Sequence, residues 1–399
     1  MKVLESKSQT CLPARQGVKE SKPYLLAVSL LFIFFTTCFS QENNLEVSGY
    51  YKNILTLSKS LYTKEDIFAD TQRARLEFKK ETAPWQFFLS VDNEAIVNDF
   101  ANTSDFSFIR SKIQDNLTAI DLDKVSVDNE HLYLKHSVYR AYLKYYQPEF
   151  QAVLGKQSID WGRMRFYSPL DLFNSLAPTE LELDERIGID ALNLNFSSSD
   201  FSGLNLILAP AKNSGEASFG VRLFHKIETF DCALIAASIR KDKVLGFLFD
   251  GYLRDAGFRG EFSYTKQDNK REFPRVSLGL DYNFFAKLYL LFEQFFNGGA
   301  DDNDATALTS SYSLSRKILS LKKHLSNLGI TYELAPLVKL DNFIIYDWEG
   351  KSVFLNPQIR YNILENTDIS LGAQLFQGRN NSEFGDYQNA YYLQVKVFF

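Results

Sequence analysis

The chain has 399 residues, 45% of them hydrophobic, and a formal net charge of −5. This acidic balance offers no basic surface, so no nucleic-acid partner is expected. Cys11 and Cys38 lie in the leader described next, and Cys232 is the only cysteine after it. An internal disulfide and a CxxC site are therefore excluded. The four histidines show no ligand spacing such as HExxH, so no metal site and no cofactor are expected.

The N-terminal region has the order of an export signal. Basic residues at Lys19 and Lys22 precede an apolar run over 24–35, and small residues follow it. A charged stretch, an apolar stretch and a cleavage site in this order are typical of a signal peptide. No later apolar run reaches the length of about 18 residues that a spanning helix requires. The sequence predicts a cleaved signal peptide over 1–40 and a mature chain over 41–399, with an N-terminal membrane anchor as the alternative.

After the leader, apolar and polar residues alternate along many short segments. Ala74, Leu76 and Phe78, for example, alternate with charged neighbours. A strand with lipid on one side and water on the other has this period of two, although a soluble β-sandwich produces it too. Strands are predicted at 45–57, 70–81, 85–93, 133–146, 149–157, 187–198, 201–210, 216–226, 229–239, 244–252, 256–267, 273–284, 287–297, 327–336, 338–346, 353–362, 368–377 and 389–399.

The gaps between these strands tend to alternate between tight turns and long polar stretches. The long ones include 94–132, 158–186, 298–326 and 378–388. Short turns on one rim and long extracellular loops on the other are typical of outer-membrane barrels. The predicted fold is therefore all-β: a transmembrane, antiparallel, up-and-down β-barrel of about 18 strands (16–18).

The last ten residues form an amphipathic strand with an aromatic end. Its outward face is predicted to carry Tyr391, Leu393, Val395, Val397 and Phe399. This strand resembles the terminal strand of bacterial outer-membrane proteins, which the barrel assembly machinery recognises. The resemblance implies location in the bacterial outer membrane, with outer-membrane lipid and the assembly machinery as partners. Pairing of this strand with the first would remove both sheet edges.

The segment from Leu154 to Leu192, LGKQSIDWGRMRFYSPLDLFN…LDERIGIDAL, resembles porin-like outer-membrane proteins of Gram-negative bacteria. In porins the third long loop usually folds inward and narrows the pore, which implies that role for 158–186. The candidate constriction residues are Arg163, Arg165, Asp171, Glu182, Asp184 and Arg186. The alternative is a loop packed on the barrel mouth, with its charges paired to each other.

The polar strand faces, if they line the lumen, carry more basic than acidic residues. The predicted inward bases are Arg73, Arg75, Lys79, Arg140, Lys144, Lys156, Arg222, Arg259, Arg275, Arg360 and Lys396, and the acids are Glu46, Glu77, Glu261, Asp281 and Glu333. A basic lumen raises the local anion concentration, which favours a mild anion preference. The alternative is a set of salt bridges that only brace the wall.

The favoured function is passive diffusion of small hydrophilic solutes through a porin-like channel, without enzymatic activity. A barrel enzyme is one alternative, with His131 or His136 as its base. A scaffold for a partner such as an outer-membrane cytochrome is another, although the mature chain has no CxxCH motif of its own. A soluble exported β protein and assembly into a homo-oligomer also stay open.

Overall fold

The computed structural model describes residues 45–113, 118–173, 178–181, 186, 188–199, 201–212, 214–268, 271–300 and 319–399. The segment Glu42–Phe399 forms one compact unit, separate from Met1–Gln41. Within the described residues, no helix is long and apolar enough to cross a membrane.

Each of the predicted strands is present, with ends shifted by a few residues. The first half of the chain holds β1 (Leu45–Lys59), β2 (Asp66–Thr82), β3 (Trp85–Ile96), β4 (Asp123–Asp128), β5 (Tyr133–Gln147), β6 (Phe150–Gln157), β7 (Ile189–Ser199), β8 (Ser202–Ala209), β9 (Ser218–Ile227) and β10 (Phe230–Ile239). The second half holds β11 (Asp242–Leu253), β12 (Ala256–Lys266), β13 (Glu272–Phe284), β14 (Leu288–Asn297), β15 (His324–Ala335), β16 (Val338–Asp347), β17 (Ser352–Leu364), β18 (Thr367–Gln377) and β19 (Ala390–Phe398).

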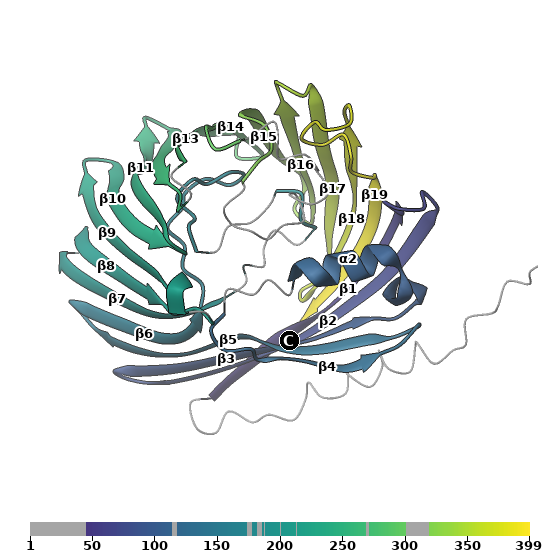
Figure 1. Ribbon diagram of the computed structural model, residues 1–399, viewed down its shortest axis with the longest axis horizontal. Helices are drawn as coiled ribbons and strands as arrows, with labels where there is room; N and C mark the ends of the chain where they lie inside the picture. The colour runs from purple at the N-terminus through teal and green to yellow at the C-terminus, as the bar shows by residue number, and fades with distance from the viewer. Residues whose placement is uncertain are drawn as a thin grey trace, which may run out of the picture. The chain divides into compact units, whose positions relative to one another are not determined.

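The strands form one antiparallel sheet that closes on itself (Figure 1). Consecutive strands pair along the chain, except that β3 pairs with β5, and β19 pairs with β1 over Tyr50↔Phe398 to Ser58↔Ala390. The backbone of the last residue completes the seam, because Gly49 N donates to Phe399 O at 2.9 Å and Phe399 N donates to Gly49 O at 3.0 Å. Closure satisfies the backbone groups of both edge strands, as a barrel in lipid requires. The predicted up-and-down barrel of 18 strands is confirmed.

The loop between β3 and β5 contains structure that the sequence pattern did not predict. It holds a short 3-10 helix, η2 (Asp99–Asn102), the helix α2 (Ser104–Ile113) and the extra strand β4. The strand β4 pairs with the upper part of β5, from Asp123↔Ser137 to Asp128↔Tyr133. The start of α2 is tied to the β1–β2 turn, because Ser60 Oγ donates to Asp105 at 2.6 Å.

The outward face of the barrel wall is mainly apolar and the inward face carries the charged residues, as the alternation predicts. Side chains of directly opposed residues lie on the same face of the sheet, so the register sorts every strand into outward and inward positions. Large apolar side chains stand exposed on the outward face, such as Leu234 (59%), Leu245 (62%) and Leu371 (58%). The inward face carries charged residues, but over β7–β17 it also carries buried apolar ones such as Leu248 and Phe354. These apolar positions receive a loop.

Candidate functional site

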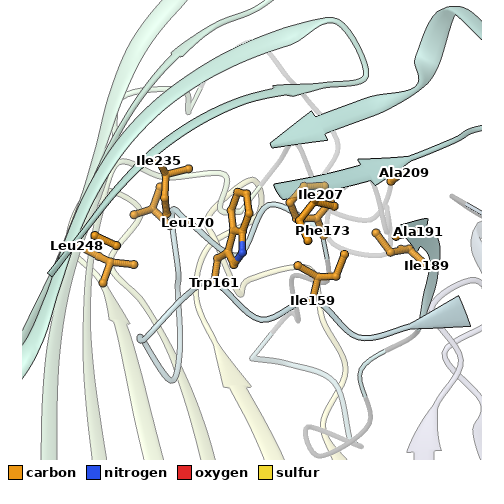
Figure 2. Packing of buried hydrophobic residues seen from close by; sticks show 11 residues of the cluster. Ile159, Trp161, Leu170, Phe173, Ile189, Ala191, Ile207, Ala209, Ile235 and Leu248 are labelled. Atoms are coloured by element: carbon orange, nitrogen blue, oxygen red, sulfur yellow. The ribbon is translucent and has the colours of Figure 1, made fainter. Parts of the chain in front are cut away.

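The segment between β6 and β7 packs against the inward face of the barrel wall. Ile159, Trp161, Leu170 and Phe173 from this loop form one buried cluster with wall residues of β7, β8, β10 and β11 (Figure 2). The wall contributes Ile189, Ala191, Ile207, Ala209, Ala233, Ile235 and Leu248. Trp161 also donates its indole N–H to Asn205 Oδ1 at 2.9 Å. The loop therefore lies inside the barrel and not across its outer rim.

A second cluster fixes the tip of the same loop to the next part of the wall. Phe166 and Tyr167 pack with Leu291, Phe295, Leu325, Phe343, Ile345 and Phe354 of β14–β17, and with Phe384. The Tyr167 and Phe295 rings are stacked at 5.0 Å. Burial raises the pKa of the Tyr167 hydroxyl well above its usual 10.0. Together the two clusters attach the loop to wall strands between β7 and β17.

Two wall carboxylates hold the loop's backbone between these clusters. Glu261 of β12 accepts hydrogen bonds from Arg163 N and, at 3.0 Å, from Met164 N through one oxygen. Its other oxygen accepts from Ser168 Oγ at 2.7 Å and Leu170 N at 3.0 Å. Glu261 is 2% exposed, so these four donors replace the water that a carboxylate would otherwise bind.

Glu293 of β14 holds the loop backbone between the residues that Glu261 binds. Its two oxygens accept from Arg165 N at 2.8 Å and from Phe166 N at 3.0 Å. The side chain is fully buried. In addition, Ser277 of β13 donates to Tyr167 O at 2.8 Å. A loop has unpaired backbone N–H groups, and these two glutamates, here called the glutamate clamp, satisfy them from the wall.

The candidate charges near the ends of the loop are paired with each other. Arg186 donates to Asp171 at 2.5 Å and to Asp160 at 3.1 Å, and Asp171 is 5% exposed. The carbonyl of Arg186 accepts from Tyr139 Oη at 2.6 Å and from Arg140 at 2.9 Å. These contacts tie the returning end of the loop to β5. Glu182 and Asp184 lie outside the described residues.

Arg163 and Arg165 present their side chains at the free surface of the loop. The Arg163 side chain is 37% exposed and its Nε lies 4.0 Å from Asp250 of β11. Arg165 is exposed, and among the described residues its side chain has no ion-pair partner. The inward Arg222 of β9 contacts the Phe224 ring at 5.7 Å, and its Nε is buried without a hydrogen-bond partner. Arg163 and Arg165 therefore lie on the loop, and Arg222 lies on the inward face of the wall strand β9.

Four other predicted lumen arginines are paired with wall carboxylates. Arg73 contacts Glu94 at 2.5 Å, and Arg75 contacts Asp92 at 2.6 Å. Arg259 contacts Asp281, and Arg360 contacts Asp341 at 3.2 Å. The partners Asp92, Glu94 and Asp341 were absent from the acids predicted to face inward. Pairing across neighbouring strands braces the wall and reduces the net positive charge that these arginines contribute.

The remaining predicted lumen bases have individual partners. Lys79 contacts Glu46 at 3.2 Å and Glu81 at 3.5 Å. Arg275 donates to Asn297 at 3.0 Å, and Lys144 lies over the Tyr146 ring at 5.7 Å. Lys396 lies over the Tyr50 ring at 4.2 Å, and Lys156 is opposite Asp190 in the register.

Of the two histidines of the enzyme alternative, His136 lies on the outward wall and His131 in an exposed turn. His136 is on the outward face, with Nδ1 2.7 Å from Asn93 and Nε2 3.0 Å from Ser126. His131 is exposed at the start of the β5 hairpin, 2.5 Å from Asp99. Among the described residues, no group of His, Cys, Asp and Glu is arranged to hold a metal ion.

The fold is similar to that of several solved structures. OccAB4 of Acinetobacter baumannii has a TM-score of 0.59 and 11% identity, over 90% of this chain and 99% of that chain. OccAB3 of the same organism has a TM-score of 0.58 and 10% identity, over 89% and 99%. OccK8 (OprE) of Pseudomonas aeruginosa has a TM-score of 0.54 and 8% identity, over 89% and 98%. No protein-family model and no curated protein sequence matches the chain.

Proposed function

We propose that this chain is a porin-like channel of the bacterial outer membrane, through which small hydrophilic solutes diffuse passively. The observation that carries the proposal is the part of the loop at residues 158–173, which the glutamate clamp and two apolar clusters hold inside a closed barrel. A barrel of 18 strands encloses a lumen wide enough for water. A loop fixed in that lumen sets a narrow point, and the charges at the narrow point select the solutes.

The proposed selectivity is a mild preference for anions. It is supported by Arg163 and Arg165 at the loop surface and by Arg222 of β9, whose charge interacts with that of Arg163. The paired wall arginines add little to the positive potential of the lumen, because a neighbouring carboxylate offsets the charge of each one. A cluster of like charges in a narrow, low-dielectric passage concentrates the opposite ion.

Planar-bilayer recordings of the purified protein test both parts of the proposal. Discrete single-channel steps are expected, and a salt gradient should give a reversal potential on the anion-selective side. Arg165→Gln should move this potential toward zero, while Lys351→Gln, in the short turn between β16 and β17, should leave it unchanged. Absence of conductance would reject the channel, and cation selectivity would reject the anion preference alone.

The route to the membrane is part of the same proposal. Residues 1–40 act as a cleaved signal peptide, and the terminal strand with Phe399 engages the barrel assembly machinery. Mass spectrometry of the mature N-terminus and outer-membrane fractionation test these two steps. A sheath around a cytochrome is disfavoured, because the loop occupies the space in which such a partner would lie. The chain carries out no catalysis on this proposal.

A further inference from the structure

A groove of about 740 Å³ opens on the outward face of the wall, over strands β7 to β11. In the register, Leu204 of β8 is opposite both Phe196 and Leu223. Leu234 of β10 is likewise opposite both Leu223 and Phe247. These five residues line the groove and form one apolar row across neighbouring strands. A phenylalanine stands at each end of the row, and the smaller leucines between them leave the hollow.

The row lies on the lipid-facing side of the barrel, near the rim formed by the short turns. Strands β7 to β11 form one continuous side of the barrel in Figure 1. Leu223 and Leu234 are more than half exposed, as apolar side chains are where the wall contacts acyl chains. The turns at 148–149 and 228–229 join β5 to β6 and β9 to β10. Short turns lie on the periplasmic rim of outer-membrane barrels, so the groove opens toward the periplasmic leaflet.

Polar side chains line the end of the groove that is nearest these turns. Ser202 and His225 are opposite each other in the register, two residues beyond Leu204 and Leu223. Ser202 Oγ lies 2.5 Å from His225 Nδ1. Glu149, in the turn between β5 and β6, lines the same groove and is exposed. Among the described residues, neither its carboxylate nor His225 Nε2 has a hydrogen-bond or ion-pair partner.

These unpaired groups match a zwitterionic head group. When Ser202 donates to Nδ1, the neutral His225 ring carries its proton on Nε2, which can then donate to a phosphate oxygen. An ammonium group pairs with the Glu149 carboxylate through charge-assisted hydrogen bonds. A phospholipid with a primary ammonium group presents this phosphate and this ammonium on one molecule, next to its acyl chains. An anionic head group without an ammonium would leave Glu149 unpaired and would be repelled by it.

We infer that this groove binds one zwitterionic phospholipid of the periplasmic leaflet, and we call it the lipid groove. An acyl chain packs against the apolar row, and the head group meets Ser202, His225 and Glu149. The occupant follows from the position in the membrane and from the charge of the polar end, since both an acyl chain and an ammonium group are needed. The inference rests on the outer-membrane location and does not depend on solute passage through the lumen.

Native mass spectrometry of the delipidated protein in detergent tests the lipid groove. Phosphatidylethanolamine is added as the zwitterionic lipid, and phosphatidylglycerol is the anionic comparison. One phosphatidylethanolamine is expected to bind more tightly than further copies of it and more tightly than phosphatidylglycerol. Glu149→Gln should raise its dissociation constant by about ten-fold, the usual scale for one charge-assisted contact. Asp255→Asn is the matched control and should leave the constant unchanged, because Asp255 is an exposed acid in another short turn, between β11 and β12.

A second pair of variants tests the apolar row. Leu204→Trp fills the hollow between Phe196 and Leu223, so we expect it to weaken the binding of phosphatidylethanolamine. Leu371→Trp, on the outward face of β18, is its control and should bind the lipid as the unmodified chain does. Both replacements stay apolar toward the membrane, so both barrels should remain heat-modifiable on gels.

Two results would overturn the inference. One is equal affinity of the unmodified chain for the two lipids, and the other is unchanged binding in Glu149→Gln and Leu204→Trp alike. A barrel that conducts but gives either result leaves the proposed function standing. A chain absent from the outer membrane rejects that function first.

Discussion

At the scale of single residues, the glutamate clamp is the feature that decides where the loop lies. Each clamp oxygen faces a donor, so replacement by glutamine sets an NH2 group against a backbone N–H. We expect Glu293→Gln to weaken the local attachment by about 1–3 kcal/mol, the usual effect of leaving a buried donor unsatisfied. Amide exchange at Arg165 and Phe166 should accelerate by about 5- to 150-fold. The open-channel current should also become noisier.

A matched glutamate on the same part of the barrel provides the control. Glu272 begins β13 and bonds to Tyr264 and Lys266 on the surface, with no part in holding the loop. Glu272→Gln is expected to leave both the exchange at Phe166 and the current unchanged. If Glu293→Gln behaves in the same way, then the two apolar clusters hold the loop without the carboxylates.

A buried carboxylate outside the glutamate clamp predicts a dependence on pH. Glu383, in the loop between β18 and β19, accepts from Leu321 N at 2.8 Å and from Lys322 N at 2.9 Å. Burial raises its pKa from 4.5 to about 8. The folded state thus holds a proton that the unfolded state releases, so stability is lost as the pH rises from about 4.5 through about 8. Exchange of the Leu321 and Lys322 amides, corrected for intrinsic rates, should become faster between about pH 4.5 and pH 8 and change little above pH 8.

The variant Glu383→Gln should remove this dependence on pH. Its control is Glu349→Gln, because Glu349 is exposed and also accepts a backbone hydrogen bond, from Lys323 N at 3.0 Å. A pH dependence that persists in Glu383→Gln would assign the titration to another group.

At the scale of elements, two glycines on the inward wall allow the loop to dock. A Cβ at Gly220 would lie 2.4 Å from Trp161 Cη2, and one at Gly246 would lie 2.3 Å from Leu170 Cδ2. Gly220→Val should therefore displace Trp161, with a red shift of its fluorescence and a change in single-channel conductance. The barrel itself should remain heat-modifiable, since its strands keep their pairing.

The control for this prediction is another inward glycine. A Cβ at Gly329 would have no neighbour closer than 3.5 Å, so Gly329→Ala should leave fluorescence and conductance as they are. Unchanged conductance in Gly220→Val despite the fluorescence shift would show that this part of the loop does not set the narrow point.

The strands could be predicted because an apolar outward face against lipid imposes a period of two. The alternation did not identify the inward residues where the inward face of the wall is apolar. Leu248 and Phe295 face inward and are buried beneath the loop, so inward acids such as Glu293 were not recognised among apolar neighbours. The ion pair of Arg75 with Asp92 could not be predicted from the alternation either, because it depends on the register between two strands. The helix α2 and β4 were missed because they lie in the stretch 94–132, which the polar composition assigned to one long loop.

At the scale of the whole molecule, a closed barrel in a bilayer places lipid on the outward face of each strand and water on the inward face. An added charge is therefore costly on one face of a strand and tolerated on the other. Ile359 and Gln358 are neighbours in the middle of β17, with Ile359 outward and 39% exposed. An arginine at a lipid-facing midplane position costs about 2–4 kcal/mol, and a lumen-facing arginine is solvated by water. We expect Ile359→Arg to lower the yield of heat-modifiable barrel in the outer membrane, while Gln358→Arg assembles normally. Equal yields would mean that this wall does not face lipid, and would contradict the membrane-spanning barrel on which the proposed channel depends.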